Sequence, residues 1–359
     1  MVLPGHPDKV CDQVADAVVA ECYRADPQAY CQVEASCWRD EFFLTGGTAT
    51  RRPLETPLEE IVQKVGREVG YTAGNAVDAS RWTVRNAVCQ EVRDPRQWTE
   101  HTNDQCVVVG YAGYDPRTRY LPPEHFLAHR LREALALSCK GGRLKGQGPD
   151  GKLLVRMREE GSEWILEHVL VTIQQMESSA FADLCAWVEA DLREAYDRTK
   201  AEDRRWARDW EDAELLVNPN GPLVNGGPDG DNGQTGRKLV MDYYGPRVPL
   251  GGGALSGKDL THVDRAGAYA ARQAAVTAVA TGASECLVKV AYAPNLDEPL
   301  DVAYEMSGRG ARLPREWFSH ERIRSRPTGI PFDSSLGSGG HHYLPSPWNK
   351  SVKADSVDR

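Results

Sequence analysis

The segment GHPDKVCD, near the start of the chain, gathers side chains that could bind an anion or a metal–phosphate complex. His6, Asp8, Lys9 and Asp12 precede or open a predicted helix, where backbone amides and the helix dipole favour negative charge. His and Asp at a helix start are also common as capping and first-turn residues. The pattern therefore leaves two interpretations open, a phosphate site and a helix cap.

Two glycine-rich loops carry further candidates, NPNGPLVNGGPDGDNGQTGRK at 218–238 and GGGALSGKD at 251–259. Loops of this composition let the backbone approach a ligand closely, and the alternative is a flexible surface linker. The second loop has the spacing of a nucleotide-binding phosphate loop, but Asp259 stands where that motif needs a hydroxyl and no apolar strand leads into it. Lys258 stays a candidate phosphate ligand through a different geometry.

The elements that must position these loops form a mixed α and β pattern. Apolar residues recur at helical spacing over 10–18 and 58–69, and 31–45 has the pattern of a hairpin. The central part predicts a helix over 126–137, a hairpin turned at 159–162 and a long polar helix that ends near Trp210. After it, KLVMDYY predicts a strand, 264–281 an alanine-rich helix, and ECLVKVAYA and LDVAYEM two further strands.

Length and composition limit the classes of protein. A chain of 359 residues with 41% hydrophobic and 26% charged residues predicts a globular protein of two or three domains. The formal charge of −9 argues against nucleic acid and anionic membranes as partners. No stretch is long enough to span a bilayer and no signal peptide is evident, so the sequence predicts a soluble, cytoplasmic protein.

The nine cysteines are scattered, without a C-x-x-C pair that would indicate zinc or redox chemistry. We expect reduced thiols. Cys11 and Cys106 adjoin polar motifs and could be reactive, but burial as small hydrophobic residues is the favoured interpretation.

The motifs taken together resemble those of the S-adenosylmethionine synthetase family. The matching segments, in order, are GHPDKVCDQVADA, NDQCVVVGYA, PDGK, NGGPDGDNGQTGRK, GGGALSGKD and VDRAGAYAAR. The resemblance extends from Gly5 to PWNK at 347–350 and implies an α+β fold of three similar domains in a pseudo-threefold arrangement. We place their boundaries at 1–95, 101–222 and 223–359.

The resemblance also implies an activity, that of a methionine adenosyltransferase. In this reaction the sulfur of methionine attacks C5′ of ATP and expels tripolyphosphate, which is then cleaved to pyrophosphate and phosphate. Mg²⁺ and K⁺ are the implied cofactors. The implied assembly is a homodimer or a dimer of dimers, with active sites between subunits.

Carried over position by position, the resemblance assigns roles to residues of this chain. A highly charged leaving group needs cations around it, which fits the basic residues of the motifs. The implied catalytic residues are His6, at the scissile C5′ oxygen, and Lys152, Arg237, Lys238 and Lys258, around the phosphates. The implied ATP-binding set is His6, Asp150, Lys152, Leu223, Asp231, Arg237, Lys238, Ala254 and Lys258. The implied methionine-binding set is Thr48, Gln90, Asp104, Asp231 and His262, and the implied metal ligands are Asp8 and Asp264 for Mg²⁺ and Glu34 for K⁺.

The chain departs from the family where methionine is selected and adenine is stacked. Thr48 stands where the family has a glutamate that grips the methionine ammonium, and His262 replaces a lysine. Leu223 replaces the aromatic residue that stacks on adenine, and Pro294 the isoleucine on the other face. The family's usual S-E-S-V-S-E segment before GHPDK is missing, which a truncated gene model would explain.

Three hypotheses follow from these departures. The first is methionine adenosyltransferase activity with compensating contacts. The second is a specialised adenosyl or nucleosyl transferase that uses a methionine analogue, another nucleophile or another nucleoside triphosphate. The third is a non-catalytic regulatory subunit, against which the retained cations and carboxylates argue.

Overall fold

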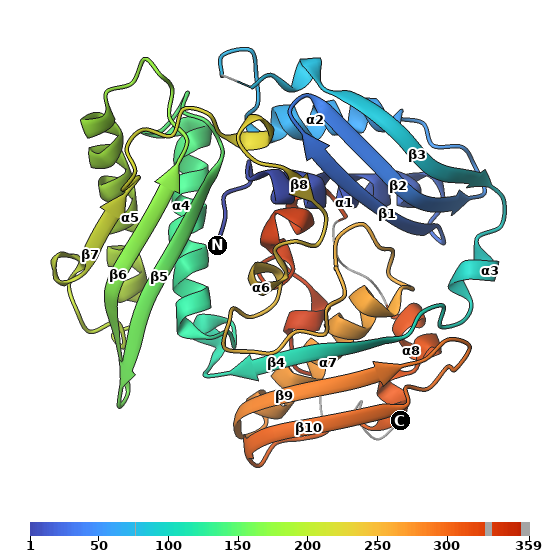
Figure 1. The fold of residues 1–359 in the computed structure, drawn as a ribbon. Helices are drawn as coiled ribbons and strands as arrows, with labels where there is room; N and C mark the ends of the chain where they lie inside the picture. The colour runs from blue at the N-terminus through green and yellow to red at the C-terminus, as the bar shows by residue number, and fades with distance from the viewer. Residues whose placement is uncertain (76, 327–331, 353–359) are drawn as a thin grey trace.

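The computed structural model describes residues 1–75, 77–326 and 332–352. Three small sheets, each backed by helices, lie around a central region of loops (Figure 1). This is the α+β architecture that the sequence predicts. Among the described residues, no helix is both long and apolar enough to cross a bilayer.

The first sheet carries the motif at the start of the chain. Its strand order is β3-β2-β1-β8, with β1 and β2 antiparallel and β3 parallel to β2. Two helices cover its inner face, and their apolar residues form one core with the strands. The elements are α1 (Pro7–Ala25), β1 (Tyr30–Trp38), β2 (Glu41–Thr50), α2 (Leu58–Val69), β3 (Thr83–Val92) and β8 (Gly233–Gln234). The predicted hairpin and both predicted helices are confirmed.

The second sheet has the order β5-β6-β7 and is backed by two long helices. Its elements are α4 (Pro123–Gly141), β5 (Gly151–Glu160), β6 (Glu163–Ile173), α5 (Phe181–Glu202) and β7 (Glu214–Val217). The chain start joins its edge, since Leu3 N donates to Gly151 O at 2.8 Å. The helix predicted to end near Trp210 ends earlier, because Asp203 is already extended and only a 3₁₀ turn, Trp210–Asp212, follows.

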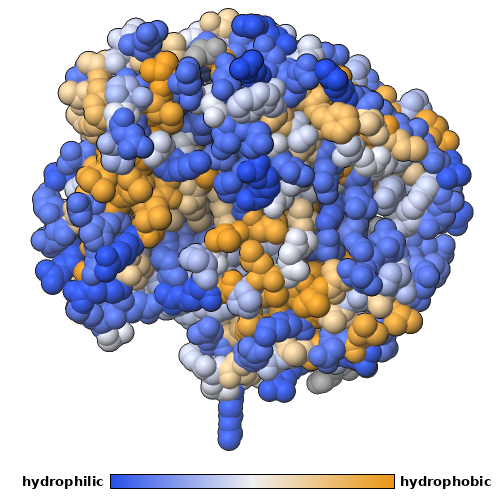
Figure 2. All heavy atoms as spheres, in the orientation of Figure 1, coloured by the Kyte–Doolittle hydropathy of each residue, from blue (hydrophilic) through white to orange (hydrophobic). Residues whose placement is uncertain are grey.

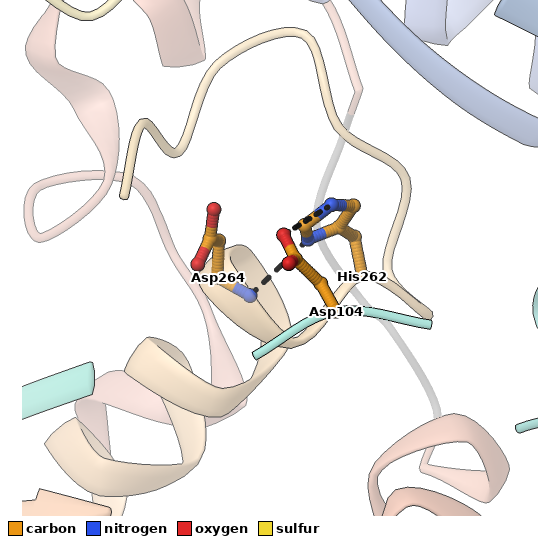
Figure 3. Close-up of side chains that lie close together, drawn as sticks. All are labelled: Asp104, His262 and Asp264. Atoms are coloured by element: carbon orange, nitrogen blue, oxygen red, sulfur yellow. Dashed lines mark hydrogen bonds and ion pairs between the residues drawn. The ribbon is translucent and has the colours of Figure 1, made fainter. Parts of the chain in front are cut away.

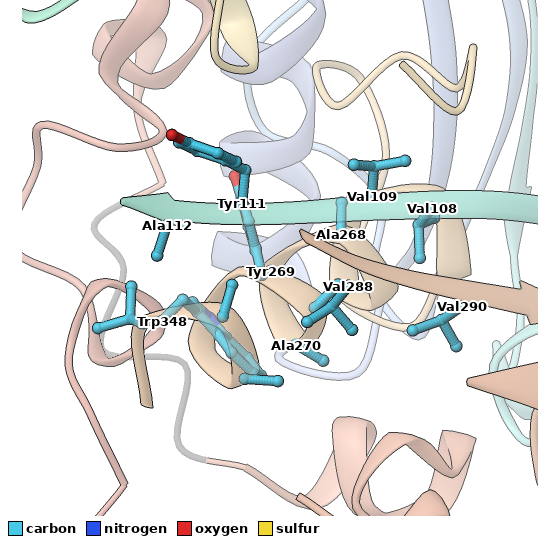
Figure 4. Close-up of a cluster of buried hydrophobic side chains, with 14 of the residues drawn as sticks. Val108, Val109, Tyr111, Ala112, Ala268, Tyr269, Ala270, Val288, Val290 and Trp348 are labelled. Atoms are coloured by element: carbon cyan, nitrogen blue, oxygen red, sulfur yellow. The ribbon is translucent and has the colours of Figure 1, made fainter. Parts of the chain in front are cut away.

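The third sheet has the order β10-β9-β4 and packs on α7 (Figure 4). Its strands are β4 (Cys106–Gly113), β9 (Ala283–Tyr292) and β10 (Asp301–Gly308), and α7 spans Val263–Ala280. Alanines on α7 allow close packing, so that a Cβ on Gly110 would lie 2.0 Å from the carbonyl carbon of Ala271. The strand β4 falls in the range 101–222 but pairs with β9, so the sheets do not follow contiguous ranges; the domain boundaries themselves stay a prediction.

Three short helices complete the fold, α3 (Arg96–Thr99), α6 (Leu239–Asp242) and α8 (His320–Ser325). The strand predicted for KLVMDYY is wrong, because this segment forms α6. Its backbone closes helical hydrogen bonds, Asp242 N to Lys238 O at 3.1 Å and Tyr243 N to Leu239 O at 2.9 Å. A short apolar run has no period that separates a strand from a buried helical turn.

Candidate active site

Three aspartates spaced four residues apart form a buried stripe along α1. Asp8, Asp12 and Asp16 lie on one face of the helix because its repeat is 3.6 residues. Each accepts a hydrogen bond from the backbone of a glycine-rich loop. The donors are Gln234 N to Asp8 at 2.9 Å, Gly236 N to Asp12 at 2.8 Å and Gly257 N to Asp16 at 3.0 Å. One helix face therefore holds both loops, 218–238 and 251–259, in place.

Each aspartate of the stripe also has a basic partner. Asp8 pairs with Lys238, and Asp12 accepts from Lys9 Nζ at 2.9 Å. Asp16 accepts from Arg265 Nη1 at 2.7 Å, with both side chains fully buried. Because buried charges are costly unless they are paired, these contacts fix the relative positions of α1, α7 and the loops.

His6 is the N-cap of α1 and is buried. Its Nδ1 accepts the backbone N–H of Asp8 at 3.2 Å, so the proton of the neutral ring is on Nε2. Nε2 is buried and has no partner among the described residues. Burial, and then the charge of Lys238, lower the pKa of His6 to about 4. His6 is thus both a cap and a neutral N–H donor with a free bonding position.

A first cluster of charges gathers around His6 and Asp8. Lys238 pairs with Asp8, and Arg237 Nε lies 3.6 Å from the same carboxylate. Lys152, on β5, is exposed, and its charge also lowers the pKa of His6. The charge of Asp231, in the loop before β8, acts in the opposite direction. The cluster joins residues that are more than 200 positions apart in the sequence.

A second cluster lies at the start of α7, where Asp104 and His262 face each other beside Asp264 (Figure 3). His262 caps the helix, since its Nδ1 accepts the backbone N–H of Asp264 at 3.3 Å, and its Nε2 lies 3.7 Å from Asp104 Oδ2. Lys258 forms an ion pair with Asp264. Burial, followed by the charge of Lys258, lowers the pKa of His262, so its ring is neutral near pH 7.

The donor set of this second cluster fits a divalent metal ion. Asp104, His262 and Asp264 offer ligand atoms that all lie within 4.8 Å of one another. The cap hydrogen bond places the imidazole proton on Nε2, so nitrogen ligation would require His262 to give up the cap. The carboxylates of Asp104 and Asp264 need no such change, and hard oxygen ligands suit Mg²⁺.

Three residues predicted to bind methionine or potassium lie on the first sheet: Glu34 on β1, Thr48 on β2 and Gln90 on β3. Glu34, on β1, is exposed on the outer face, beside a cavity of about 440 Å³ that Thr48 also lines. Thr48 pairs in register with Cys31 and with Gln90, and Cys31 is part of the core. Directly opposed residues share a sheet face, so the side chain of Thr48 lies on the core side and is buried.

The other predicted ATP-binding residues lie on the two loops or against them. Asp150 is buried and accepts from Gly227 N at 2.8 Å, and burial raises its pKa to about 6. Leu223 is half-buried and pairs with the end of β6 through Gln174. Ala254 is half-buried and packs against Gly236. This contact brings the loop 251–259 against the loop 218–238.

Sequence reasoning missed several residues that hold this site. Asp16, Asp242 and Arg265 are buried partners of the motif residues, and Asp242 pairs with Lys9. The spacing of Asp8, Asp12 and Asp16 was a usable signal, because three acids on one helix face seldom stay buried without basic partners. Arg265 and Asp242 carry no such signal, since only the fold brings them to α1.

The geometry describes a class of protein, one whose site offers lysines, an arginine, carboxylates and a neutral histidine to a metal–polyphosphate substrate. Family models cover most of the chain: the N-terminal domain of S-adenosylmethionine synthetase matches residues 1–92, the central domain 99–223 and the C-terminal domain 225–323. The S-adenosylmethionine synthase of Wolinella succinogenes is 33% identical, over 99% of this chain and 95% of the relative. That of Thermosynechococcus vestitus is 34% identical, over 98% and 94%, and that of Methylobacterium radiotolerans 36%, over 86% and 80%. The chain belongs to the S-adenosylmethionine synthetase family.

Proposed function

We propose that this chain is a methionine adenosyltransferase that converts ATP, methionine and water to S-adenosylmethionine, phosphate and pyrophosphate. The observation that carries the proposal is the unpartnered Nε2–H of buried His6, which lies beside the Asp8–Lys238 pair. Family membership supplies the reaction, and two of the S-adenosylmethionine synthases named above match this chain over 95% and 94% of their own length.

In this mechanism the methionine sulfur donates an electron pair to C5′ of ATP, and the C5′–O bond breaks with its pair leaving on the triphosphate oxygen. The neutral His6 donates a hydrogen bond to that oxygen as negative charge develops. A pKa of about 4 makes His6 a poor proton donor near pH 7, so its contribution is electrostatic. Lys152, Arg237 and Lys238 surround the phosphates from one cluster, and Lys258 from the other.

The ion pairs of the site suggest how the substrate binds. Lys238 neutralises the charge of Asp8, and Lys258 that of Asp264. Each ion pair keeps both of its side chains in the site before substrate binds. A metal–triphosphate complex brings charges of both signs. Lys238 and Lys258 would turn to phosphate oxygens and Asp8 and Asp264 would hold the metal, so that one set of charge-assisted contacts would replace another.

We further propose Mg²⁺ and K⁺ as the cofactors. Asp8 and Asp264 would hold Mg²⁺, with Asp104 beside the latter, and Glu34 would hold K⁺. Bound Mg²⁺ would neutralise phosphate charge as the leaving group departs. The oxygen-only ligands available without loss of a helix cap support Mg²⁺ over a softer metal.

The remaining predicted residues complete the proposed substrate contacts. Leu223 and Ala254 would lie against the nucleoside, and Asp150 and Asp231 would contact ATP, Asp231 also facing methionine. Thr48, Gln90, Asp104 and His262 would lie around methionine. His262 offers a neutral N–H donor in place of the lysine of the family, since burial lowers its pKa.

The alternative, a specialised transferase with a different nucleophile or nucleotide, is not favoured. The three family models and the full-length relatives all belong to S-adenosylmethionine synthetases. Thr48, His262 and Leu223 are then local departures within the same reaction.

We also propose a homodimer or dimer of dimers with active sites between subunits. Figure 2 shows apolar side chains gathered over β5 and β6 and across the middle of the same face. Leu154 and Val240 are about half exposed there and line one cavity of about 860 Å³. An exposed apolar area of this kind is typical of a protein interface. Native mass spectrometry that finds only monomers at micromolar concentration would contradict this proposal.

A cytoplasmic location is the setting we propose. All nine cysteines lie in the described part of the chain and are free thiols. Free thiols in this number are typical of a reducing compartment.

The function is tested by mass spectrometry of reactions with ATP, Mg²⁺, K⁺ and methionine, using His6→Asn as the key variant. Asparagine keeps the cap of α1 but cannot place an N–H where Nε2 lies. We expect S-adenosylmethionine from the wild type and a fall in kcat of about 10²–10³ in the variant. His168→Gln is the matched control, because His168 is exposed and paired with Glu214 at 2.8 Å. No product from the wild type, or equal rates in both variants, would refute the proposal.

A further inference from the structure

Two charged residues of the segment GHPDKVCD, Lys9 and Asp12, have no place among the proposed substrate contacts. The side chain of Lys9 is fully buried, so its charge is not available to a phosphate group of the substrate. Its ammonium donates instead to Asp12 Oδ2 at 2.9 Å and pairs with Asp242, on α6. These three side chains, each at most 3% exposed, are called the buried triad below.

The buried triad holds both ends of the segment 236–242. At the first end, the other carboxylate oxygen of Asp12, Oδ1, accepts a hydrogen bond from Gly236 N at 2.8 Å. At the second end, the side chain of Asp242 pairs with Lys9, and its backbone N donates to Lys238 O at 3.1 Å. A single ammonium group on α1 therefore ties down the beginning and the end of this segment.

The segment carries two cations of the first cluster. Lys238 is the N-cap of α6 and pairs with Asp8, and Arg237 Nε lies 3.6 Å from the same carboxylate. Unlike Lys9, Arg237 is exposed and Lys238 is partly exposed, so both can meet a polyphosphate. A long side chain on a fixed backbone loses less conformational entropy when it binds, which favours affinity.

Local structure alone cannot hold this segment in place. The helix α6 has four residues, about one turn, and a helix this short is not stable in water without tertiary contacts. The chain enters it through Gly236, whose φ of 79° favours glycine, and a Cβ there would lie 2.8 Å from Ala254 Cβ. The buried triad supplies charged contacts that fix the segment to α1.

We propose that Lys9 is a positioning residue of the transfer reaction. Through the two aspartates of the buried triad, it holds the backbone from which Arg237 and Lys238 reach the triphosphate. The affinity for the leaving group then depends on a side chain that never touches it. This inference rests on the proposed function, of which it explains how the phosphate-binding cations are placed.

The test uses Asp242→Leu, which cuts the buried triad at α6. Lys9→Met would leave two buried carboxylates without a cation, whereas in Asp242→Leu the ammonium keeps Asp12 as its partner and the chain should fold. Calorimetry with inorganic tripolyphosphate and Mg²⁺ measures the phosphate site without turnover. We expect the Kd for tripolyphosphate to rise about tenfold, as for the loss of one charge-assisted contact. In steady state, kcat should fall about tenfold or more, with the KM for methionine within twofold of wild type.

Asp203→Leu is the matched control. Asp203 is also a buried acid that shares its basic partner with a second acid, since Arg205 pairs with it and, at 2.9 Å, with Asp115. None of these three residues is a proposed substrate contact. We expect the Kd for tripolyphosphate to stay within twofold of wild type in this variant, because a contact that only stabilises the fold does not change the affinity of the folded protein.

A second comparison repeats Asp242→Leu in a Lys238→Met background. If the buried triad acts through Lys238, its loss should matter less once that side chain is gone, since residues that act through one another are not additive. We expect Asp242→Leu to raise the Kd for tripolyphosphate threefold or less in this background.

Three results would overturn the inference: a Kd within twofold of wild type in Asp242→Leu, an equal rise in Asp203→Leu, or a rise above threefold in the Lys238→Met background. The binding assay also separates this inference from the proposed function. If the wild type makes no S-adenosylmethionine but binds tripolyphosphate, and Asp242→Leu binds it about tenfold more weakly, the function fails and the positioning role stands. A wild type that does not bind tripolyphosphate refutes both.

Discussion

The ion pair between Lys258 and Asp264 makes a contribution to the free energy of unfolding that can be tested before substrate binds. Both side chains are about 9% exposed, so each charge depends on the other for compensation. Breaking a buried pair by removing one partner costs about 3–5 kcal/mol, and we take about 2–3 kcal/mol here because the site opens to solvent. Lys258→Met and Asp264→Asn should each lower stability by that amount.

The double variant should be more stable than the sum of its parts. Removing both charges leaves no uncompensated group, so the expected coupling energy is about 2 kcal/mol. With an unfolding entropy of roughly 2.1 cal/mol/K per residue, 1 kcal/mol shifts the Tm of a chain of this length by about 1.3 °C. We therefore expect each single variant to lose about 3–4 °C and the double variant to lose about 3–5 °C, against about 5–8 °C if the two losses were additive.

Scanning calorimetry without ligands measures these shifts, and steady-state assays measure turnover. Turnover should fall at least 10²-fold in all three variants, since each lacks a proposed contact to the metal or to phosphate. Stability and activity thus respond differently to the second substitution. Additive losses of Tm in the double variant would refute the pairing that we infer.

Three further predictions follow from the same contacts. Gly253→Ala should lower kcat/KM at least tenfold with a Tm change below about 2 °C in calorimetry, because its Cβ would lie 2.5 Å from Asp264 Cγ and displace the carboxylate. Arg265→Met should lower the Tm by about 4–7 °C, since it leaves fully buried Asp16 without its partner; an unchanged Tm would contradict this. Stability, measured as Tm against pH, should fall as the pH drops from about 6.5 toward 4. Burial lowers the pKa of seven histidines in the folded chain, so in this pH range only the unfolded chain takes up protons on them. The seven affected histidines are His6, His125, His129, His262, His320, His341 and His342, and the raised pKa values of Asp12 and Asp150 offset part of the loss. A flat profile over this range would contradict the burial of these groups.

The helices and hairpins could be predicted because their signals are local. The valines of α1 and the apolar stripe of α2 have the helical period, and each hairpin has an alternating pattern around a turn. The segment that forms α6 could not be assigned, since a short apolar run fits a strand as well as a buried turn. The pairing of β4 with β9 could not be predicted either, because strand partners 170 or more residues apart leave no local signal.

The candidate site could be predicted in part, because its motifs are also local signals in the sequence. The motifs identify His6, Asp8, Lys238, Lys258 and Asp264, but not which of them form one cluster. Strand register decides which face a side chain takes, and a shift of one residue reverses it. The core-facing side of Thr48 and the outward side of Glu34 therefore had to come from the structure.

The central claim is that sulfur attack at C5′ releases the triphosphate chain intact, beside the neutral donor His6. A rapid-quench experiment tests it directly, with enzyme in excess over ATP, in the presence of Mg²⁺, K⁺ and methionine, and with the products separated by ion-exchange chromatography. The account predicts that tripolyphosphate forms first, in equal amount to S-adenosylmethionine, and is then converted to pyrophosphate and phosphate. Appearance of ADP or AMP ahead of any tripolyphosphate would show cleavage within the phosphate chain and would contradict the account.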